Sequence, residues 1–159
     1  MKEEKEFYTN GQLMESGFVN DYGKQGKWFF YNEDGTILKE VEYKDDVEHG
    51  LFTRYFDNGK IALQSNFKDG RYDGPGIEYY ENGQVKEDWI YRNEIFFSIN
   101  FWNENGEQTL IEGKGFKIAK FGTAGGDVYI QYIENGSLVK EEKIQSSIFL
   151  GFKPDNESE

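Results

Sequence analysis

Along most of the chain, aromatic and aliphatic residues alternate with polar ones, and Asn-Gly or Asp-Gly pairs interrupt the alternation at regular intervals. The clearest copy is Tyr55-Phe56-Asp57-Asn58-Gly59-Lys60-Ile61, where an aromatic and an aliphatic residue flank a turn sequence. Such alternation is typical of half-buried strands, and an Asn-Gly or Asp-Gly pair between two such stretches is a strong signal for a β-hairpin. The pattern therefore predicts a series of hairpins.

The glycines of these turns recur at a nearly constant spacing of 24, 24, 24, 23 and 30 residues. They are Gly11, Gly35, Gly59, Gly83, Gly106 and Gly136. A fixed period of this length indicates a repeat array in which each unit is one supersecondary element. We predict an all-β fold, a single elongated and twisted antiparallel β-sheet that forms a meander of about six tandem hairpins.

The turn sequences also predict the geometry of each hairpin. A two-residue loop at Asn58-Gly59 would place Phe56 opposite Ile61, whereas a three-residue loop with Gly59 in the left-handed region would place Tyr55 opposite Ile61. Aromatic–aliphatic cross-strand pairs stabilise a sheet by roughly 0.2–1 kcal/mol each, which favours the three-residue loop. The pairs expected from this loop are Tyr31/Ile37, Tyr55/Ile61, Tyr79/Val85 and Tyr132/Leu138.

Strict alternation divides the predicted sheet into an apolar face and a wetter face. With Tyr31, Tyr55 and Tyr79, the apolar face receives Phe29, Val41, Tyr43, Leu63, Phe67, Ile77, Trp89 and Tyr91. The wetter face receives Glu40, Glu42, Gln64, Asn66 and Asp88, together with several aromatic residues. Those aromatics are Trp28, Phe30, Phe52, Phe56 and Tyr80, and we predict that they bind a partner, with acidic turns around them.

The regular pattern sets the expected boundaries of the array. Residues 1–6 form a charged leader that we expect to be frayed, the array covers 7–153, and 154–159 is expected to be a disordered tail. An insertion at 113–126 departs from the period and predicts an added strand and a turn at Gly125-Gly126. The apolar residues 148–152 are expected to cap the open end of the array.

Charge and composition narrow the classes of function. The chain of 159 residues carries 18 Lys and Arg against 30 Asp and Glu, a formal net charge of −12. This charge argues against nucleic acid and against docking on an anionic bilayer, and it suits a basic protein partner. The absence of cysteine excludes disulfides, thiolate zinc sites and a cysteine nucleophile. No apolar run approaches the ~20 residues of a membrane span, so we expect no membrane insertion and a cytoplasmic protein, or an exported one if a signal peptide has been trimmed.

The sequence from Gly26 to Gly35, GKWFFYNEDG, resembles a MORN-type repeat. The most similar branch is the variant repeat of bacterial proteins, which includes small proteins described as antitoxins or toxin-immunity partners. The resemblance covers about residues 7–112, and 128–144 less closely. It implies successive β-hairpins in one long sheet, a role in protein–protein interaction or self-association, and no catalysis by the repeats.

The sequence contains no recognisable catalytic set, metal site or cofactor motif. His49 is the only histidine and lies in a charged connection, while Glu141-Glu142 are adjacent on a strand and point to opposite faces. The glycine-rich stretch 122–126 lacks the Gly-Lys-Ser/Thr ending of a phosphate loop. We therefore expect a non-enzymatic protein-binding module, antitoxin- or immunity-like, and keep as the alternative a carbohydrate or cell-wall binding module with stacked aromatics.

Overall fold

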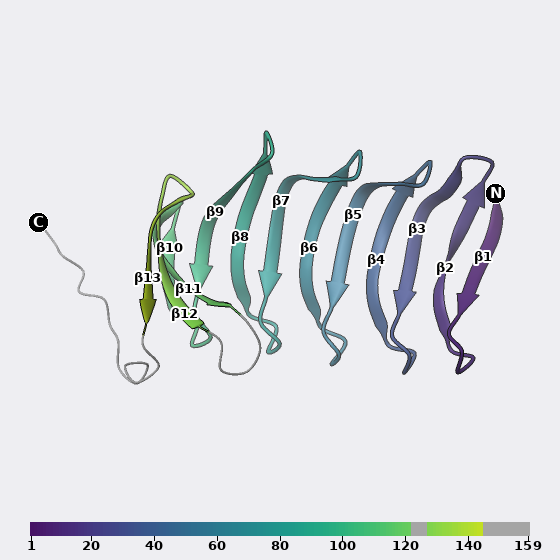
Figure 1. Ribbon diagram of the computed structural model, residues 1–159, viewed down its shortest axis with the longest axis horizontal. Coiled ribbons are helices and arrows are strands. Elements are labelled where there is room, and N and C mark those ends of the chain that lie inside the picture. Colours follow the sequence, from purple (N-terminus) through teal and green to yellow (C-terminus); the bar gives the residue numbers. More distant parts are fainter. Residues whose placement is uncertain (122–126, 145–159) are drawn as a thin grey trace, which may run out of the picture.

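The computed structural model describes residues 1–121 and 127–144, which form thirteen β-strands and no helix (Figure 1). The strands are β1 (Lys2–Phe7), β2 (Leu13–Asn20), β3 (Gly23–Tyr31), β4 (Ile37–Lys44), β5 (Val47–Tyr55), β6 (Ile61–Lys68), β7 (Arg71–Tyr79), β8 (Val85–Arg92), β9 (Ile95–Trp102), β10 (Gln108–Ile111), β11 (Lys114–Phe121), β12 (Asp127–Glu134) and β13 (Ser137–Ile144).

All thirteen strands belong to one sheet, and their order in the sheet is their order in the chain. Every neighbouring pair is antiparallel, from β1–β2 to β12–β13. Figure 1 shows the strands side by side in an elongated row, with β1 at one end. The predicted all-β meander of hairpins is confirmed.

The hairpin loops have the predicted three residues in the regular repeats. At the turn after β5, Gly59 N–H donates to the Phe56 carbonyl (2.9 Å) and Phe56 N–H donates to the Lys60 carbonyl (2.8 Å). Gly59 has φ +78°, and Tyr55 pairs with Ile61. The pairs Tyr31/Ile37 and Tyr79/Val85 follow the same register and are also confirmed.

Side chains of several turns join them to the turn of the next repeat. Asn10 donates to the Glu33 carbonyl (3.1 Å) and Asn58 to the Glu81 carbonyl (3.1 Å), in both cases 23 residues ahead. The Tyr80 hydroxyl likewise donates to the Trp102 carbonyl (2.8 Å). Because the turns recur at a nearly constant spacing, these hydrogen bonds form a row along one margin of the sheet.

The predicted Tyr132/Leu138 pair is wrong. Tyr132 pairs with Lys140, and Ile133 pairs with Leu138. The loop here has only two residues, Asn135-Gly136, with φ of +52° and +76° as in a type I′ turn. This turn packs on earlier strands, since Gly136 N–H donates to Gly113 (2.9 Å) and the Gly136 carbonyl accepts from Ser98 N–H (3.0 Å).

The division of residues between the two faces also differs from the prediction. Val41 pairs with Trp28 instead of lying with Phe29, because β4 holds one extra residue between the pairs Phe30/Lys39 and Tyr31/Ile37. Such a bulge shifts the alternation by one residue, and a shift of one exchanges the faces. The same irregularity follows the turns after β5 and β7.

One face, here called the tryptophan face, carries a central row of opposed residues: Trp28, Val41, Phe52, Ser65, Gly76, Trp89 and Ser98. The other, here called the tyrosine face, carries the neighbouring row Phe29, Glu40, Thr53, Gln64, Ile77, Asp88 and Asn100. The apolar and polar sets predicted for opposite faces are therefore mixed, and most of the burial is on the tryptophan face.

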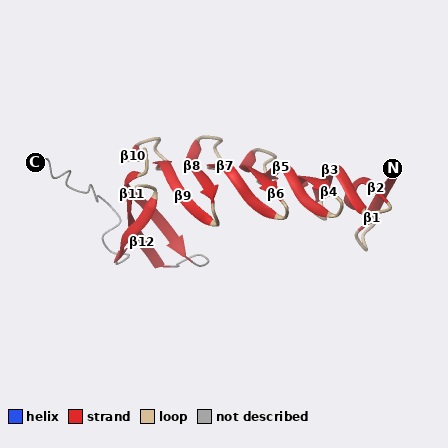
Figure 2. Ribbon diagram, turned by 90° about the horizontal axis from the view of Figure 1, so that it is seen from above, coloured by secondary structure: helices blue, strands red, loops and turns tan. Residues whose placement is uncertain are grey.

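Strands β10–β13, here called the C-terminal lobe, leave the line of the repeats (Figure 2). Its buried core consists of Leu110 and Ile133 together with Phe101 of the neighbouring β9. The predicted added strand within the insertion is β11, whereas the expected turn at Gly125-Gly126, the cap at 148–152 and the tail at 154–159 lie outside the described residues. At the other end, residues 2–6 are part of β1 instead of a frayed leader.

Candidate functional site

The tryptophan face buries large side chains by setting them against small ones. Trp28 is only 1% exposed, and its ring occupies the place where Gly17 has no side chain. Gly76 has the same relation to Trp89. Burying a side chain of this size stabilises a fold by roughly 1.5–3 kcal/mol. Paired small and large residues thus let a single sheet bury two indoles.

Six aromatic rings from β5–β9 form a continuous group, here called the aromatic cluster: Phe52, Phe67, Tyr72, Trp89, Tyr91 and Phe96. Tyr72 is at its centre, with ring centroids 4.4 Å from Phe67, 5.6 Å from Trp89 and 6.2 Å from Tyr91. Phe96 lies 4.7 Å from Trp89 on its other side. Tyr72 is 36% exposed and Phe96 is 44% exposed, so the cluster presents two rings to solvent above a buried tryptophan.

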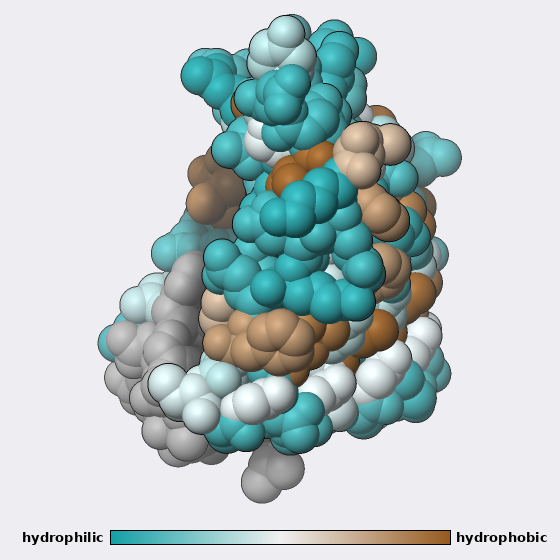
Figure 3. Space-filling view, turned by 90° about the vertical axis from the view of Figure 1, so that its right-hand side faces the viewer, coloured by the Kyte–Doolittle hydropathy of each residue, from teal (hydrophilic) through white to brown (hydrophobic). Residues whose placement is uncertain are grey.

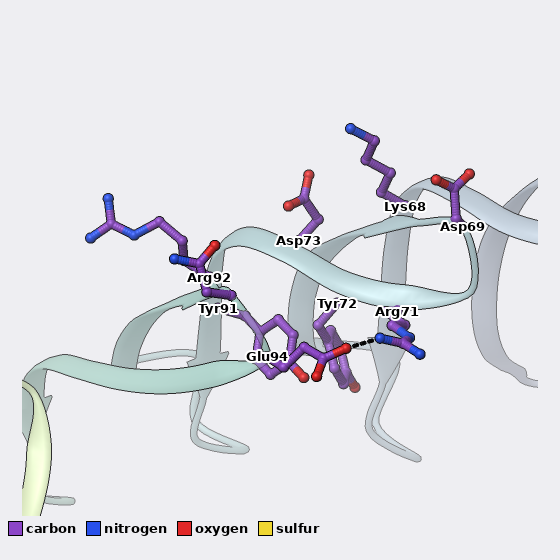
Figure 4. Close-up of a pocket in the computed structure, with 9 residues that line it drawn as sticks. Lys68, Asp69, Arg71, Tyr72, Asp73, Tyr91, Arg92 and Glu94 are labelled. Atoms are coloured by element: carbon purple, nitrogen blue, oxygen red, sulfur yellow. Dashed lines mark hydrogen bonds and ion pairs between the residues drawn. The ribbon is translucent and has the colours of Figure 1, made fainter.

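A hollow of about 470 Å³ adjoins the aromatic cluster, between the connections β6–β7 and β8–β9 (Figure 4). Tyr72 and Tyr91 line its base, and Arg71 forms an ion pair with Glu94 across it. Figure 4 shows Lys68, Asp73 and Arg92 pointing away from this pair. The site therefore combines exposed aromatic surface with charges of both signs.

A second aromatic group, at the β3–β4 end of the tryptophan face, is already occupied by a side chain of the protein. The Lys24 ammonium lies 4.1 Å from the centroid of Trp28, 5.0 Å from Phe30 and 5.6 Å from Tyr43. Both Glu15 carboxylate oxygens accept from it at 2.8 Å. Burial, with added negative charge from Glu48, Glu15 and Asp46, raises the pKa of Tyr43 to about 12. This group is an internally satisfied cation–π contact.

The C-terminal lobe is attached to the array by a buried polar contact. Lys117 of β11 donates to Glu87 Oε1 (2.8 Å) and to Ser98 Oγ (2.9 Å), and Ser98 Oγ donates to the same carboxylate oxygen (2.5 Å). A serine beside a lysine resembles a nucleophile with its base, but Glu87 pairs with the ammonium and Ser98 is buried. The contact therefore fits a structural role.

On the tyrosine face, Glu40 is held by two partners. It accepts from Lys27 Nζ (2.8 Å) and from the Tyr55 hydroxyl (2.8 Å). Burial opposes its ionisation, but these hydrogen bonds outweigh burial and lower the pKa of Glu40. Burial and the hydrogen bond to Glu40 raise the pKa of Tyr55 to about 12. The hydrogen bond to Glu40 raises the pKa of Lys27, partly offset by burial.

The residues expected to bind a partner are not gathered in one exposed surface. Trp28 is 1% exposed and Phe52 is 9% exposed, so the expectation that they are exposed on a wetter face is wrong. The bulge in β4 brings Val41 onto their face, where it pairs with both residues and helps to bury them. Phe30, Phe56 and Tyr80 are half-buried, and the Tyr80 hydroxyl is used in the bond between repeats. Phe52 alone of the five belongs to the aromatic cluster.

Among residues 1–121 and 127–144, no group of three or more His, Cys, Asp or Glu side chains is placed to hold a metal ion. His49 Nδ1, on β5, lies 3.4 Å from Asp69 Oδ1, on the exposed β6–β7 connection. The part of the chain that the structure describes contains no helix with the length and apolar character that spanning a membrane requires.

Four consecutive stretches of the chain match the family described as MORN repeat variant: residues 2–21, 24–45, 48–69 and 72–93. They coincide with the hairpins β1–β2, β3–β4, β5–β6 and β7–β8 and together cover more than half of the chain. The chain therefore belongs to the MORN repeat variant family. A comparison with curated proteins gives no match. MORN repeats are generally non-catalytic modules associated with binding to proteins or membranes.

Sequence reasoning missed Tyr72 and Phe96 as exposed members of the site. They belong to a column of the repeat at 24-residue spacing whose other members are Lys24 and Glu48. The adjacent column is Val19, Tyr43, Phe67 and Tyr91, aromatic in three of these four repeats. Aromatic residues that appear in a variable column beside a mostly aromatic one were the available signal, because variable positions of a repeat are the ones left for specific binding.

Proposed function

We propose that this protein is a non-enzymatic module that binds another protein through the aromatic cluster. The observation that carries the proposal is the pair of exposed rings, Tyr72 and Phe96, on either side of the buried Trp89. Aromatic residues in a well-packed setting with charged residues around them are typical of interface hot spots. The rings are held by their neighbours before binding, so little conformational entropy is lost when a partner covers them.

The partner that the charge of the chain suits is a basic protein, as in a pair of toxin and antitoxin or immunity protein. The net charge of −12 gives a field that attracts a cationic partner and raises the rate of encounter. The Arg71–Glu94 ion pair beside Tyr72 and Tyr91 supplies polar contacts at the margin of the site.

A carbohydrate or cell-wall ligand has less support. Sugar-binding platforms need open aromatic faces, whereas Trp28 and Trp89 are both buried under other side chains. The rings that remain open, Tyr72 and Phe96, are in contact with Trp89 at steep and moderate angles of 89° and 37° and do not form a flat row. We therefore favour a protein partner.

The test is capture from the native cell extract on the immobilised protein and on two variants. The first variant, Tyr72→Ala/Phe96→Ala, removes the exposed rings of the aromatic cluster. The matched control, Tyr22→Ala/Phe18→Ala, removes the same ring types from exposed positions at β2 and the β2–β3 connection. We expect one stoichiometric protein on the parent chain and the control, and its loss on the first variant. Equal capture by all three, retention on cell-wall polysaccharide alone, or no specific protein would contradict the proposal.

A further inference from the structure

Strand β1 lies at one edge of the sheet that the described residues form. It pairs with β2 on one side, and among the described residues no strand pairs with its other side (Figure 1). All six of its residues are exposed. Figure 3, which views the molecule from this end, shows a broad hydrophilic area in teal. A free edge presents a row of unpaired N–H and C=O groups that another strand can bind.

The composition of this edge departs from the repeat. Twenty-four residues further on, β3 carries Trp28, Phe29 and Phe30, whereas β1 carries Glu4, Lys5 and Glu6 in the corresponding positions. Charged residues on an edge oppose indiscriminate pairing between chains. They also select a partner edge whose charges are complementary, because directly opposed charges interact across a sheet. The question is which edge complements β1.

The backbone restricts how two copies of β1 can meet. In an antiparallel pair, opposed residues are both hydrogen-bonded or both non-hydrogen-bonded, in alternation. Since β2 already uses the groups on one side of β1, only alternate residues direct N–H and C=O outward. Two identical edges related by a two-fold axis must therefore oppose even-numbered residues to even-numbered ones and odd to odd.

Within this restriction, one register matches the charges. An axis at Glu4 opposes Lys2 to Glu6 and Glu3 to Lys5, each twice by symmetry, and leaves one like-charged pair, Glu4 with itself. An axis at Glu3 gives only the Lys2–Glu4 pair, and an axis at Lys5 opposes Glu4 to Glu6. The register at Glu4 thus has four attractive pairs against one repulsive pair.

We infer that two copies of the chain associate edge to edge through β1, about a two-fold axis at Glu4. Glu3 and Lys5 already form an ion pair within one chain (2.8 Å). Across the axis they become a network of four alternating charges on one face. Closed two-fold dimers are the commonest oligomers, and this dimer continues the sheet so that the tryptophan faces of both copies lie on the same side.

The association is expected to be weak, because six residues of edge bury less area than the ~1,200 Å² of a stable interface. The net charge of −12 on each copy also opposes it. At about 0.15 M salt the Debye length is about 8 Å, which screens distant charges more than pairs opposed across about 5 Å. Sedimentation velocity at this ionic strength, up to about 200 μM protein, covers the range of affinity expected for a transient contact.

A charge exchange tests the register. One variant, Lys2→Glu/Lys5→Glu, makes the edge wholly acidic, and the other, Glu3→Lys/Glu6→Lys, makes it basic except for Glu4. We expect each alone to dimerise at least about tenfold more weakly than the parent chain, since all four attractive pairs become repulsive. A one-to-one mixture opposes unlike charges at all four pairs and is expected to form a heterodimer.

The matched control is Lys140→Glu/Lys143→Glu on β13. It replaces two lysines by glutamates, as Lys2→Glu/Lys5→Glu does, so both variants change the net charge from −12 to −16. We expect this control to dimerise like the parent chain. The inference is overturned if the parent chain is monomeric throughout the range, if the control weakens the dimer as much as the acidic edge does, or if the mixture forms no heterodimer. Circular dichroism of each variant verifies that the sheet is intact.

Discussion

The ring of Trp28 occupies the space directly beside the Cα of Gly17, so that a Cβ added there would lie 2.3 Å from the ring. Gly17 and Trp28 are on adjacent strands, β2 and β3. Along the tryptophan face the same exchange of volume recurs between β7 and β8, where Gly76 lies beside Trp89. The array therefore keeps its spacing although the sizes of its side chains differ between repeats.

Gly17→Ala is expected to destabilise the fold by about 1–3 kcal/mol, the usual cost of overpacking a filled interior. Chemical denaturation measures the change. Ser16→Ala, at the neighbouring position on the opposite face, is the matched control and is expected to cost less. The double variant Gly17→Ala/Trp28→Phe should cost less than the sum of its single changes, because the smaller ring makes room for the methyl group. If the costs of the two single changes simply add in the double variant, the contact between residue 17 and the Trp28 ring is not what destabilises Gly17→Ala.

Gly59→Ala is expected to destabilise the fold by about 1 kcal/mol for a different reason. No atom lies within 4 Å of an added Cβ, so the cost comes from φ +78° alone. Gly59→Asn should cost less than the alanine change, since asparagine tolerates the left-handed region. Thermal or urea unfolding of the parent chain and the two variants gives their order of stability. If side-chain volume set the cost instead of φ, Gly59→Asn would be less stable than Gly59→Ala.

Glu40→Gln tests the hydrogen bonds on the tyrosine face through pH. Because the pKa of Glu40 is lowered in the folded chain, its ionisation stabilises the fold above its ordinary value of 4.5, and this contribution is lost as pH falls through the folded pKa. We expect Glu40→Gln to lower the unfolding free energy by about 1 kcal/mol at pH 7 and to lose less stability than the parent chain below about pH 4.5. Glu33→Gln, on an exposed turn, is the control for loss of one charge. Parallel pH profiles for the parent chain and Glu40→Gln would contradict the account.

Lys117→Met should separate the C-terminal lobe from the repeats. It leaves Glu87 buried without its cation, and breaking a buried pair in this way costs about 3–5 kcal/mol. The double variant Glu87→Gln/Lys117→Met removes both charges and should be more stable than Lys117→Met alone. Urea unfolding gives the difference, and amide hydrogen exchange in β9–β11 locates it. A single variant as stable as the double one would show that the pair does not hold the lobe.

The fold was predictable because the turn signal repeats. A single turn sequence such as Tyr55–Ile61 is weak evidence for a fold, but the same spacing in successive units requires one sheet with a constant register. The faces were not predictable, because the bulge after each turn leaves no mark in the sequence around Phe30 and Lys39. Strict alternation across the bulge therefore placed Val41 and Trp89 on the wrong face, opposite to Trp28 and Phe52.

The C-terminal lobe and the aromatic cluster depend on contacts that the period does not encode. The two-residue loop at Asn135-Gly136 packs on β9, and no local sequence pattern indicates this packing. In the cluster, Tyr72 and Phe96 come from different repeats and each contacts Trp89, so that their arrangement is a property of the folded sheet. The non-repeating residues are thus the ones for which the structure adds most.

Amide hydrogen exchange of the protein, with and without the partner recovered by capture, tests the central claim that the aromatic cluster is the binding surface. We expect binding to protect the β6–β7 and β8–β9 connections, residues 68–73 and 92–97, where Tyr72 and Phe96 lie. Protection confined to the turns at the opposite margin, around Gly59 and Gly83, or to the C-terminal lobe would contradict the claim.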